Sequence, residues 1–173
     1  EAESSSYLPT WRKDSDYLKN YSAYSKKGGG VLLDMSHEID YINWFFKDFT
    51  ISKIYKNRIS NLNLQSEDIA LIFGKVKKNT LVKIKLTYFN KFPKRHLIFC
   101  LKDGSQLYLN LLSSEIKIFN QNKKKTFHME KYSQFKTTKQ MYSEIFNRNF
   151  KNICTLGESL DLLNKIDKSE KIQ

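Results

Sequence analysis

Hydrophobic residues recur at helical spacing directly after a run of three glycines, Gly28–Gly30. We predict a helix from Gly30 to Phe46, because apolar residues spaced four, three and four apart fall on one side of a helix. These residues are Met35, Ile39, Ile42 and Phe46. On ideal helix geometry, a separate side collects ionisable residues. These are Asp34, His37, Glu38 and Tyr41.

The middle of the chain has a different pattern, in which apolar and polar residues partly alternate. A period of two is typical of half-buried antiparallel strands. It is clearest in Leu81–Phe89, where every second residue from Val82 is apolar. The predicted strands are Glu1–Pro9, Ile51–Ile59, Asp68–Lys75, Leu81–Phe89, Leu97–Lys102, Gln106–Leu111, Glu115–Phe119 and Thr126–Glu130.

Three short polar segments are predicted to connect neighbouring strands as hairpins. Asp103-Gly104 is the strongest hairpin pattern. Lys77-Lys78-Asn79 and the tip Asn120–Lys125 are the others. From Thr137 the helical period returns and predicts a helix to about Asn152. We expect Leu156–Ser159 to interrupt it before a last amphipathic helix, which carries Leu160, Leu163 and Ile166.

Asp34 and His37 are the strongest candidates for chemistry, since an imidazole beside a carboxylate is suited to proton transfer. Glycines before them allow a close backbone approach to a ligand or to another segment. A purely structural interpretation is also open. Asp34 would then stabilise the first turn of the helix, and His37 would be a surface histidine with a nearby acid.

The segment 11–27 is aromatic, basic and polar, without the periodicity of a helix or a strand. We predict a loop there with at most a helical turn. Aromatic rings and hydroxyls of this kind suit the wall of a sugar site, although each ring could equally pack between helix and sheet. The candidate binding residues are Trp11, Arg12, Tyr17 and Tyr21, with Tyr41 from the helix.

The 173-residue chain has a formal net charge of +12, which raises the question of nucleic-acid binding. Its lysines are spread along the chain, and no nucleic-acid-binding motif occurs, so we expect no nucleic-acid partner. The basic surface could still attract an anionic substrate. No apolar run is long enough for a membrane span, and no secretory signal opens the chain, so we expect a cytoplasmic location. Cys100 and Cys154 lack ligand-like spacing and are interpreted as reduced thiols, with no metal site.

The N-terminal quarter of the chain resembles the start of the C-terminal domain of the Gfo/Idh/MocA family of NAD(P)-dependent oxidoreductases. The similarity is carried by Tyr7-Leu8-Pro9, Trp11-Arg12, Asp16-Tyr17, Tyr21-Ser22 and the block GGGVLLDMSHEID at 28–40. It implies an α+β fold, a large and mostly antiparallel open sheet with helices packed on one face, as in dihydrodipicolinate-reductase-like domains. It also implies a sugar, cyclitol or sugar-nucleotide substrate, possible use in bacterial surface-sugar biosynthesis, and a homo-oligomer formed through the sheet face.

This resemblance assigns His37 as the acid/base for the reacting hydroxyl, with Asp34 orienting it. Many family members space these two residues four apart, whereas the interval here is three. Either His37 or Asp34 could therefore be the residue that contacts the substrate.

No predicted strand is followed by a dinucleotide fingerprint of the type GxGxxG. The Glu-Lys-Pro segment of the family is also missing. We expect residues 1–173 to form a single substrate-binding and oligomerisation domain, inactive alone. NAD or NADP would be bound mainly by an N-terminal Rossmann domain that is absent from this chain. The alternative is a non-catalytic binding or dimerisation module in a degenerate relative.

Overall fold

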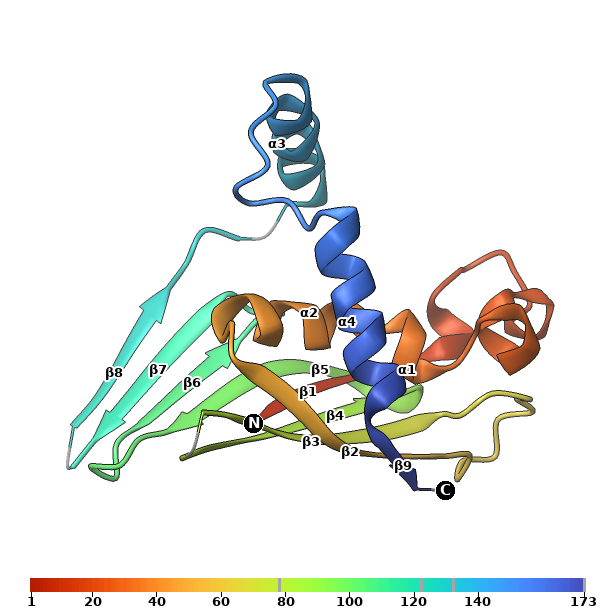
Figure 1. The fold of residues 1–173 in the computed structure, drawn as a ribbon, viewed down its shortest axis with the longest axis horizontal. Coiled ribbons are helices and arrows are strands. Elements are labelled where there is room, and N and C mark those ends of the chain that lie inside the picture. Colours follow the sequence, from red (N-terminus) through yellow and green to blue (C-terminus); the bar gives the residue numbers. More distant parts are fainter. Residues whose placement is uncertain (78, 122, 132, 173) are drawn as a thin grey trace.

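A nine-stranded sheet forms the base of the protein in a computed structural model that describes residues 1–77, 79–121, 123–131 and 133–172 (Figure 1). The strand order is β8-β7-β6-β5-β1-β4-β3-β2-β9. Among the described strands, only the pairs β1–β4 and β2–β9 are parallel. The strands are β1 (Ala2–Tyr7), β2 (Phe49–Asn57), β3 (Ile69–Val76), β4 (Thr80–Thr87), β5 (Phe89–Cys100), β6 (Gln106–Asn110), β7 (Glu115–Asn120), β8 (Lys123–His128) and β9 (Glu170–Ile172). The predicted α+β class and mostly antiparallel open sheet are confirmed.

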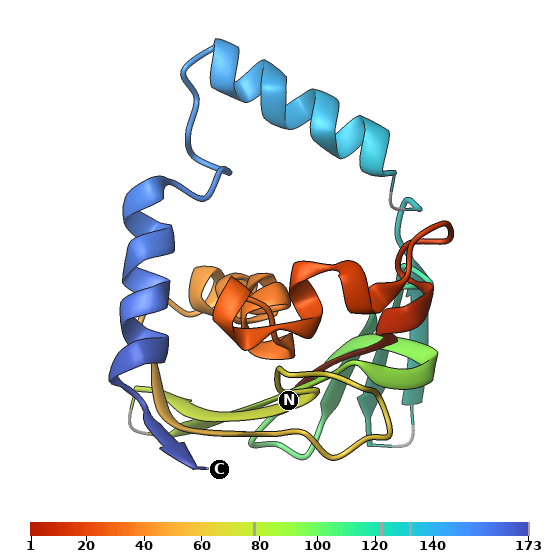
Figure 2. The same ribbon diagram turned by 90° about the vertical axis from the view of Figure 1, so that its right-hand side faces the viewer.

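Helices cover one face of this sheet. They are α1 (Val31–Asp34), α2 (Ser36–Phe45) and α4 (Leu156–Lys168), and Figure 2 shows them on the same side of the strands. The helix α3 (Gln134–Phe146) stands beyond this layer in both views (Figures 1 and 2) and buries none of its side chains. The prediction of helices on one face therefore holds for three of the four helices.

The core lies between the sheet and the α1–α2 segment. The predicted apolar side is confirmed, since Met35, Ile39 and Ile42 are buried and Phe46 is half-buried. The strands contribute the facing apolar residues Ile54, Ala70, Ile72, Ile84, Leu86 and Leu97. No helix in the described part of the chain combines the length and apolar character needed to cross a membrane.

The predicted single helix Gly30–Phe46 is wrong in one respect, because it is divided at Met35. This residue leaves helical geometry, with φ −105° and ψ 21°. Hydrophobic periodicity reports which side is buried, and both pieces keep that side against the sheet, so the pattern does not detect the break.

Other boundaries also differ from the predictions. Lys123–Lys125 belongs to β8 rather than to a hairpin tip, and α3 ends at Phe146 rather than near Asn152. The expected break at Leu156–Ser159 is instead the first turn of α4, because Thr155 and Glu158 form a capping box there. Lys78 and Asn122, in two predicted turns, lie outside the described residues. The loop 11–27 contains the short 3-10 turns Tyr17–Lys19, Tyr21–Ala23 and Ser25–Lys27.

The sheet face away from the helices carries a partly buried polar cluster at its centre. Glu3 is 8% exposed, accepts a hydrogen bond from Ser5 and lies 3.3 Å from Lys85 Nζ. Burial works to raise the pKa of Glu3, but the hydrogen bonds from Ser5 and Lys85 and the nearby charges of Lys85 and His96 lower it below its ordinary value of 4.5. A carboxyl group with a lowered pKa stabilises the fold above its unfolded-state pKa, and that contribution is lost as the pH falls through the folded-state pKa.

Replacing Glu3 with Gln is therefore expected to reduce the free energy of unfolding at pH 7 by about 1–3 kcal/mol. It should also flatten the decline in stability of the protein below pH 4.5. Urea unfolding at several pH values measures both effects. Glu170→Gln is the matched control, since its ion pair with Lys53 is exposed and should contribute little. Equal losses in the two variants would contradict the prediction.

Candidate active site

The glycine run connects the loop region to α1 through two positions that require glycine. Gly28 and Gly30 have φ values of +79° and +118°, in the region that favours glycine. The chain approaches another segment of the protein here: Val31 N–H donates to the Glu67 carbonyl at 3.2 Å. Leu32 N–H donates to a carboxylate oxygen of the same Glu67 at 3.4 Å. The backbone donors at the start of α1 are thus already used within the protein.

Asp34 is held by a buried tyrosine that the sequence did not single out. The Tyr88 hydroxyl donates to Asp34 Oδ2 at 2.5 Å, and the Tyr88 side chain is fully buried. Burial, followed by the hydrogen bond and charge of Asp34, raises the pKa of Tyr88 well above its ordinary value. Tyr88 therefore stays protonated and acts as a permanent donor to Asp34.

An exposed tyrosine completes this group. Tyr21 is 47% exposed, and its pKa is raised chiefly by a hydrogen bond with Asp34 and by the charge of that carboxylate. Trp11 packs edge-on against the Tyr88 ring with centroids 5.3 Å apart, and its indole N–H donates to Ser6 Oγ. The structure thus gathers Trp11, Tyr21 and Asp34 around one buried tyrosine.

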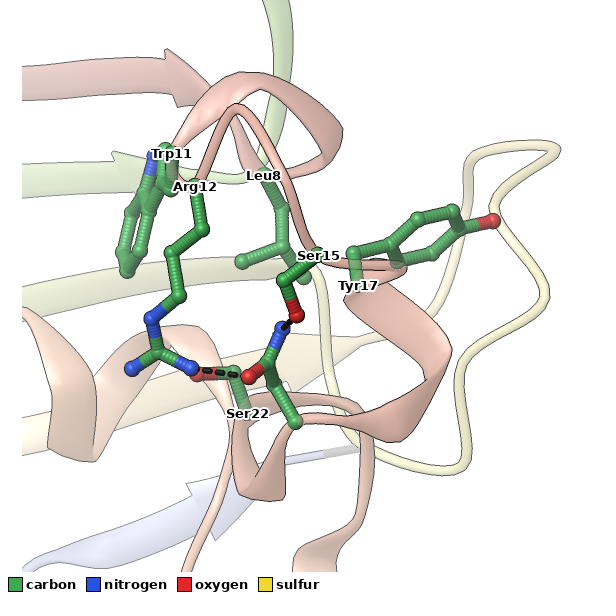
Figure 3. A pocket seen from close by; sticks show the side chains of 7 residues that line it. Leu8, Trp11, Arg12, Ser15, Tyr17 and Ser22 are labelled. Atoms are coloured by element: carbon green, nitrogen blue, oxygen red, sulfur yellow. Dashed lines mark hydrogen bonds between the residues drawn. The ribbon is translucent and has the colours of Figure 1, made fainter.

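Arg12 and Tyr17 line a small hollow beside this group (Figure 3). The Arg12 guanidinium donates to the side chain of Asn20, which also lines the hollow. The Tyr17 hydroxyl points away from the hollow in Figure 3. The remaining lining residues are Leu8, Trp11, Ser15 and Ser22.

His37 lies at the start of α2 with more than half of its side chain in solvent. Its Nε2 is 3.1 Å from Glu38 Oε1, and none of the interactions found among the described residues joins it to Asp34. The break at Met35 separates the two residues into different helices. The helical side predicted for Asp34, His37, Glu38 and Tyr41 is thus divided between an Asp34–Tyr88 group and a His37–Glu38 group.

Tyr41 lies half-buried next to the second group. Its hydroxyl is buried, and burial followed by the charge of Glu38 raises its pKa far above the ordinary value. The residue also borders a groove of about 720 Å³ between α2 and the chain leading into α4. Trp44, Lys47, Lys151, Glu158 and Asp161 line the same groove, and this mixture of charges favours no single class of ligand.

Neither Tyr88 nor Arg95 is recognisable as a site residue from the sequence. Tyr88 continues the alternating pattern of the predicted strand Leu81–Phe89, and its side chain is fully buried. Arg95 is one of many basic residues, and only the strand register places it at the buried carboxylate of Glu38.

The fold is shared with two oxidoreductases of known structure. The chain matches KijD10, a 3-ketoreductase from Actinomadura kijaniata in complex with NADP and TDP-benzene, with a TM-score of 0.69. That match has 12% identity and covers 99% of this chain and 54% of KijD10. It also matches the UDP-N-acetylglucosamine 3-dehydrogenase GnnA from Acidithiobacillus ferrooxidans, with a TM-score of 0.68 and 11% identity. That match covers 96% of this chain and 50% of GnnA.

The chain has the fold of about half of each of these two oxidoreductases. At 11–12% identity the likeness shows the fold alone. No protein-family model matches the chain. A comparison with curated proteins also found no match.

Proposed function

We propose that this chain is the substrate-binding and oligomerisation domain of an NAD(P)-dependent oxidoreductase that acts on a hydroxyl or carbonyl of a sugar, cyclitol or sugar nucleotide. The observation that supports this most is the fold shared with KijD10 and GnnA. The exposed imidazole of His37 and the hydrogen-bonded pair of Tyr88 and Asp34, both near the glycine run, add to it. The resemblance of the segment 7–40 to Gfo/Idh/MocA enzymes supports the same function.

In this proposal His37 takes the proton from the reacting hydroxyl during oxidation and returns it during reduction. Asp34 and Tyr21 contact the substrate from the neighbouring group, with Asp34 fixed in place by Tyr88. Trp11, Arg12 and Tyr17 form the wall toward the cofactor-binding domain. The indole face suits a sugar ring, and the guanidinium suits an anionic group.

In this proposal the glycine run and the start of α1 do not form a dinucleotide site. The backbone donors after the glycine run are engaged by Glu67, so they do not offer the phosphate cradle of a glycine-rich nucleotide loop. The hydride chemistry would come from NAD or NADP bound mainly by an N-terminal Rossmann domain. The proposal makes that domain the partner of residues 1–173.

Turnover of the full-length protein with NAD(P)H and nucleotide-linked keto-sugars tests this function, measured by loss of nicotinamide absorbance. The alternative is a non-catalytic binding or dimerisation module, which is favoured by the lack of a direct contact between Asp34 and His37 among the described interactions. That alternative predicts ligand binding by calorimetry without turnover for every substrate of the panel.

The open sheet face is the proposed subunit interface. Leu81 and Phe73 are exposed there, at 88% and 43%, next to lysines whose aliphatic stems can cover apolar surface. Since exposed apolar patches favour association, we expect at least a dimer packed sheet to sheet.

Sedimentation of the full-length protein at micromolar concentration measures this assembly. Phe73→Asp is expected to shift it toward monomer, whereas Phe135→Asp on α3, which is exposed but remote from the sheet, should leave it unchanged. A wild-type monomer would refute the proposed interface.

A further inference from the structure

A buried carboxylate lies directly beside the proposed catalytic histidine. Glu38 is 0% exposed, although it is in the first turn of α2, next to the exposed His37. Glutamate is almost never fully buried unless it is paired, so this burial needs a reason.

The charged partner of Glu38 comes from the sheet. Arg95 of β5 is opposite Ser4 in the register, and its Nε lies 2.8 Å from Glu38 Oε1. The guanidinium supplies the countercharge that a buried carboxylate requires. The other polar groups that face Glu38 are the imidazole of His37, 3.1 Å from the same oxygen, and the hydroxyl of Tyr41.

The polar atoms of this cluster are not yet satisfied by hydrogen bonds. Within the described chain, both Glu38 carboxylate oxygens, Arg95 Nε and the Tyr41 hydroxyl lack a well-directed hydrogen bond, despite the short ion-pair distances. Buried carboxylates need donors. The His37 ring is largely exposed, so a small rotation of its side chain can direct Nε2–H at the carboxylate without disturbing the core.

We propose that Glu38, held by Arg95, is the positioning residue for His37. Its carboxylate accepts a hydrogen bond from Nε2–H and leaves Nδ1 as the atom that takes or returns the substrate proton. Asp34, the partner expected from the sequence, is instead engaged by Tyr88 and belongs to a separate group. The catalytic meaning of this pairing rests on the proposed function, whereas the pairing itself is measurable without turnover.

The pairing is tested by NMR of the full-length protein labelled with ¹⁵N at histidine. The His37 ring signals are identified by their loss in His37→Ala. In the wild type we expect a protonated Nε2, a bare Nδ1, and exchange of the ring N–H with solvent at least about tenfold slower than for the exposed His128.

The test variants remove the carboxylate in two ways. Glu38→Met combined with Arg95→Met replaces the buried ion pair by apolar side chains, which folded proteins often tolerate. Glu38→Asp withdraws the carboxylate by one methylene and keeps the charge. Both are expected to lose the slow exchange of the His37 ring, whereas Asp34→Asn is expected to retain it.

A bare Nε2 in the wild type would overturn the proposal, even if no variant folded. Slow exchange that survives in folded Glu38→Met/Arg95→Met, or that disappears in Asp34→Asn, would also overturn it. If the enzyme is active, the double variant should lower kcat by about tenfold or more with little change in KM. A protected His37 ring in a protein without turnover would instead refute the proposed function and leave the pairing intact.

Discussion

Replacing His37 with alanine in the full-length protein is expected to lower turnover by about a hundredfold or more, while cofactor affinity stays nearly unchanged. In the proposed function this imidazole handles the hydroxyl proton, whereas the cofactor is held mainly by another domain. The side chain is more than half exposed, so its removal leaves no cavity in the core and should cost little stability. Steady-state kinetics and cofactor titration by fluorescence measure the two effects separately.

His128→Ala is the matched control, because His128 is exposed on the edge strand β8 and lies outside the candidate site. Its turnover should equal that of the wild type. Parallel losses of turnover and cofactor affinity in His37→Ala would indicate a structural role for His37. An unchanged turnover would remove it from the mechanism.

The fold could be predicted because its signals are local. Alternation in 81–89 predicted the strand β4, and the spacing from Met35 to Phe46 predicted the buried side of α2. The elements that were predicted wrongly or missed are those whose position is set by a long-range contact or a specific capping interaction. The capping box of Thr155 and Glu158 overrides the apparent helix break at Gly157. The short strand β9 forms only because β2 provides an edge for it.

The candidate site was predictable only in part, for the same reason. The sequence placed Asp34 and His37 on one helical side, because spacing is preserved through a helix. It could not show that Tyr88, 54 residues after Asp34, donates to that carboxylate. Nor could it show that Arg95 lies against Glu38, since this contact depends on the register between β1 and β5. Pairings of this kind are set by the sheet as a whole.

The glycine run can be tested independently of catalysis at Gly29, where an added Cβ atom would meet backbone rather than side-chain atoms. A Cβ atom placed there would lie 2.1 Å from the Tyr21 carbonyl oxygen and 2.7 Å from that of Ser22. Both are backbone atoms of the loop that carries the candidate binding residues. The overlap cannot be relieved by rotating a side chain, so the loop itself would have to move away from α1.

Gly29→Ala is therefore expected to destabilise the protein by about 3 kcal/mol or more, as overpacking against fixed neighbours does. Gly157→Ala is the control, since a Cβ atom there meets nothing within 4 Å and the residue lies in the first turn of α4. Alanine favours helix more than glycine does, so this variant should be neutral or stabilised by up to about 1 kcal/mol. Urea unfolding compares the two variants. Equal stability would mean that the loop 11–27 is not held against the glycine run, and the site built on that contact would then have to be reconsidered.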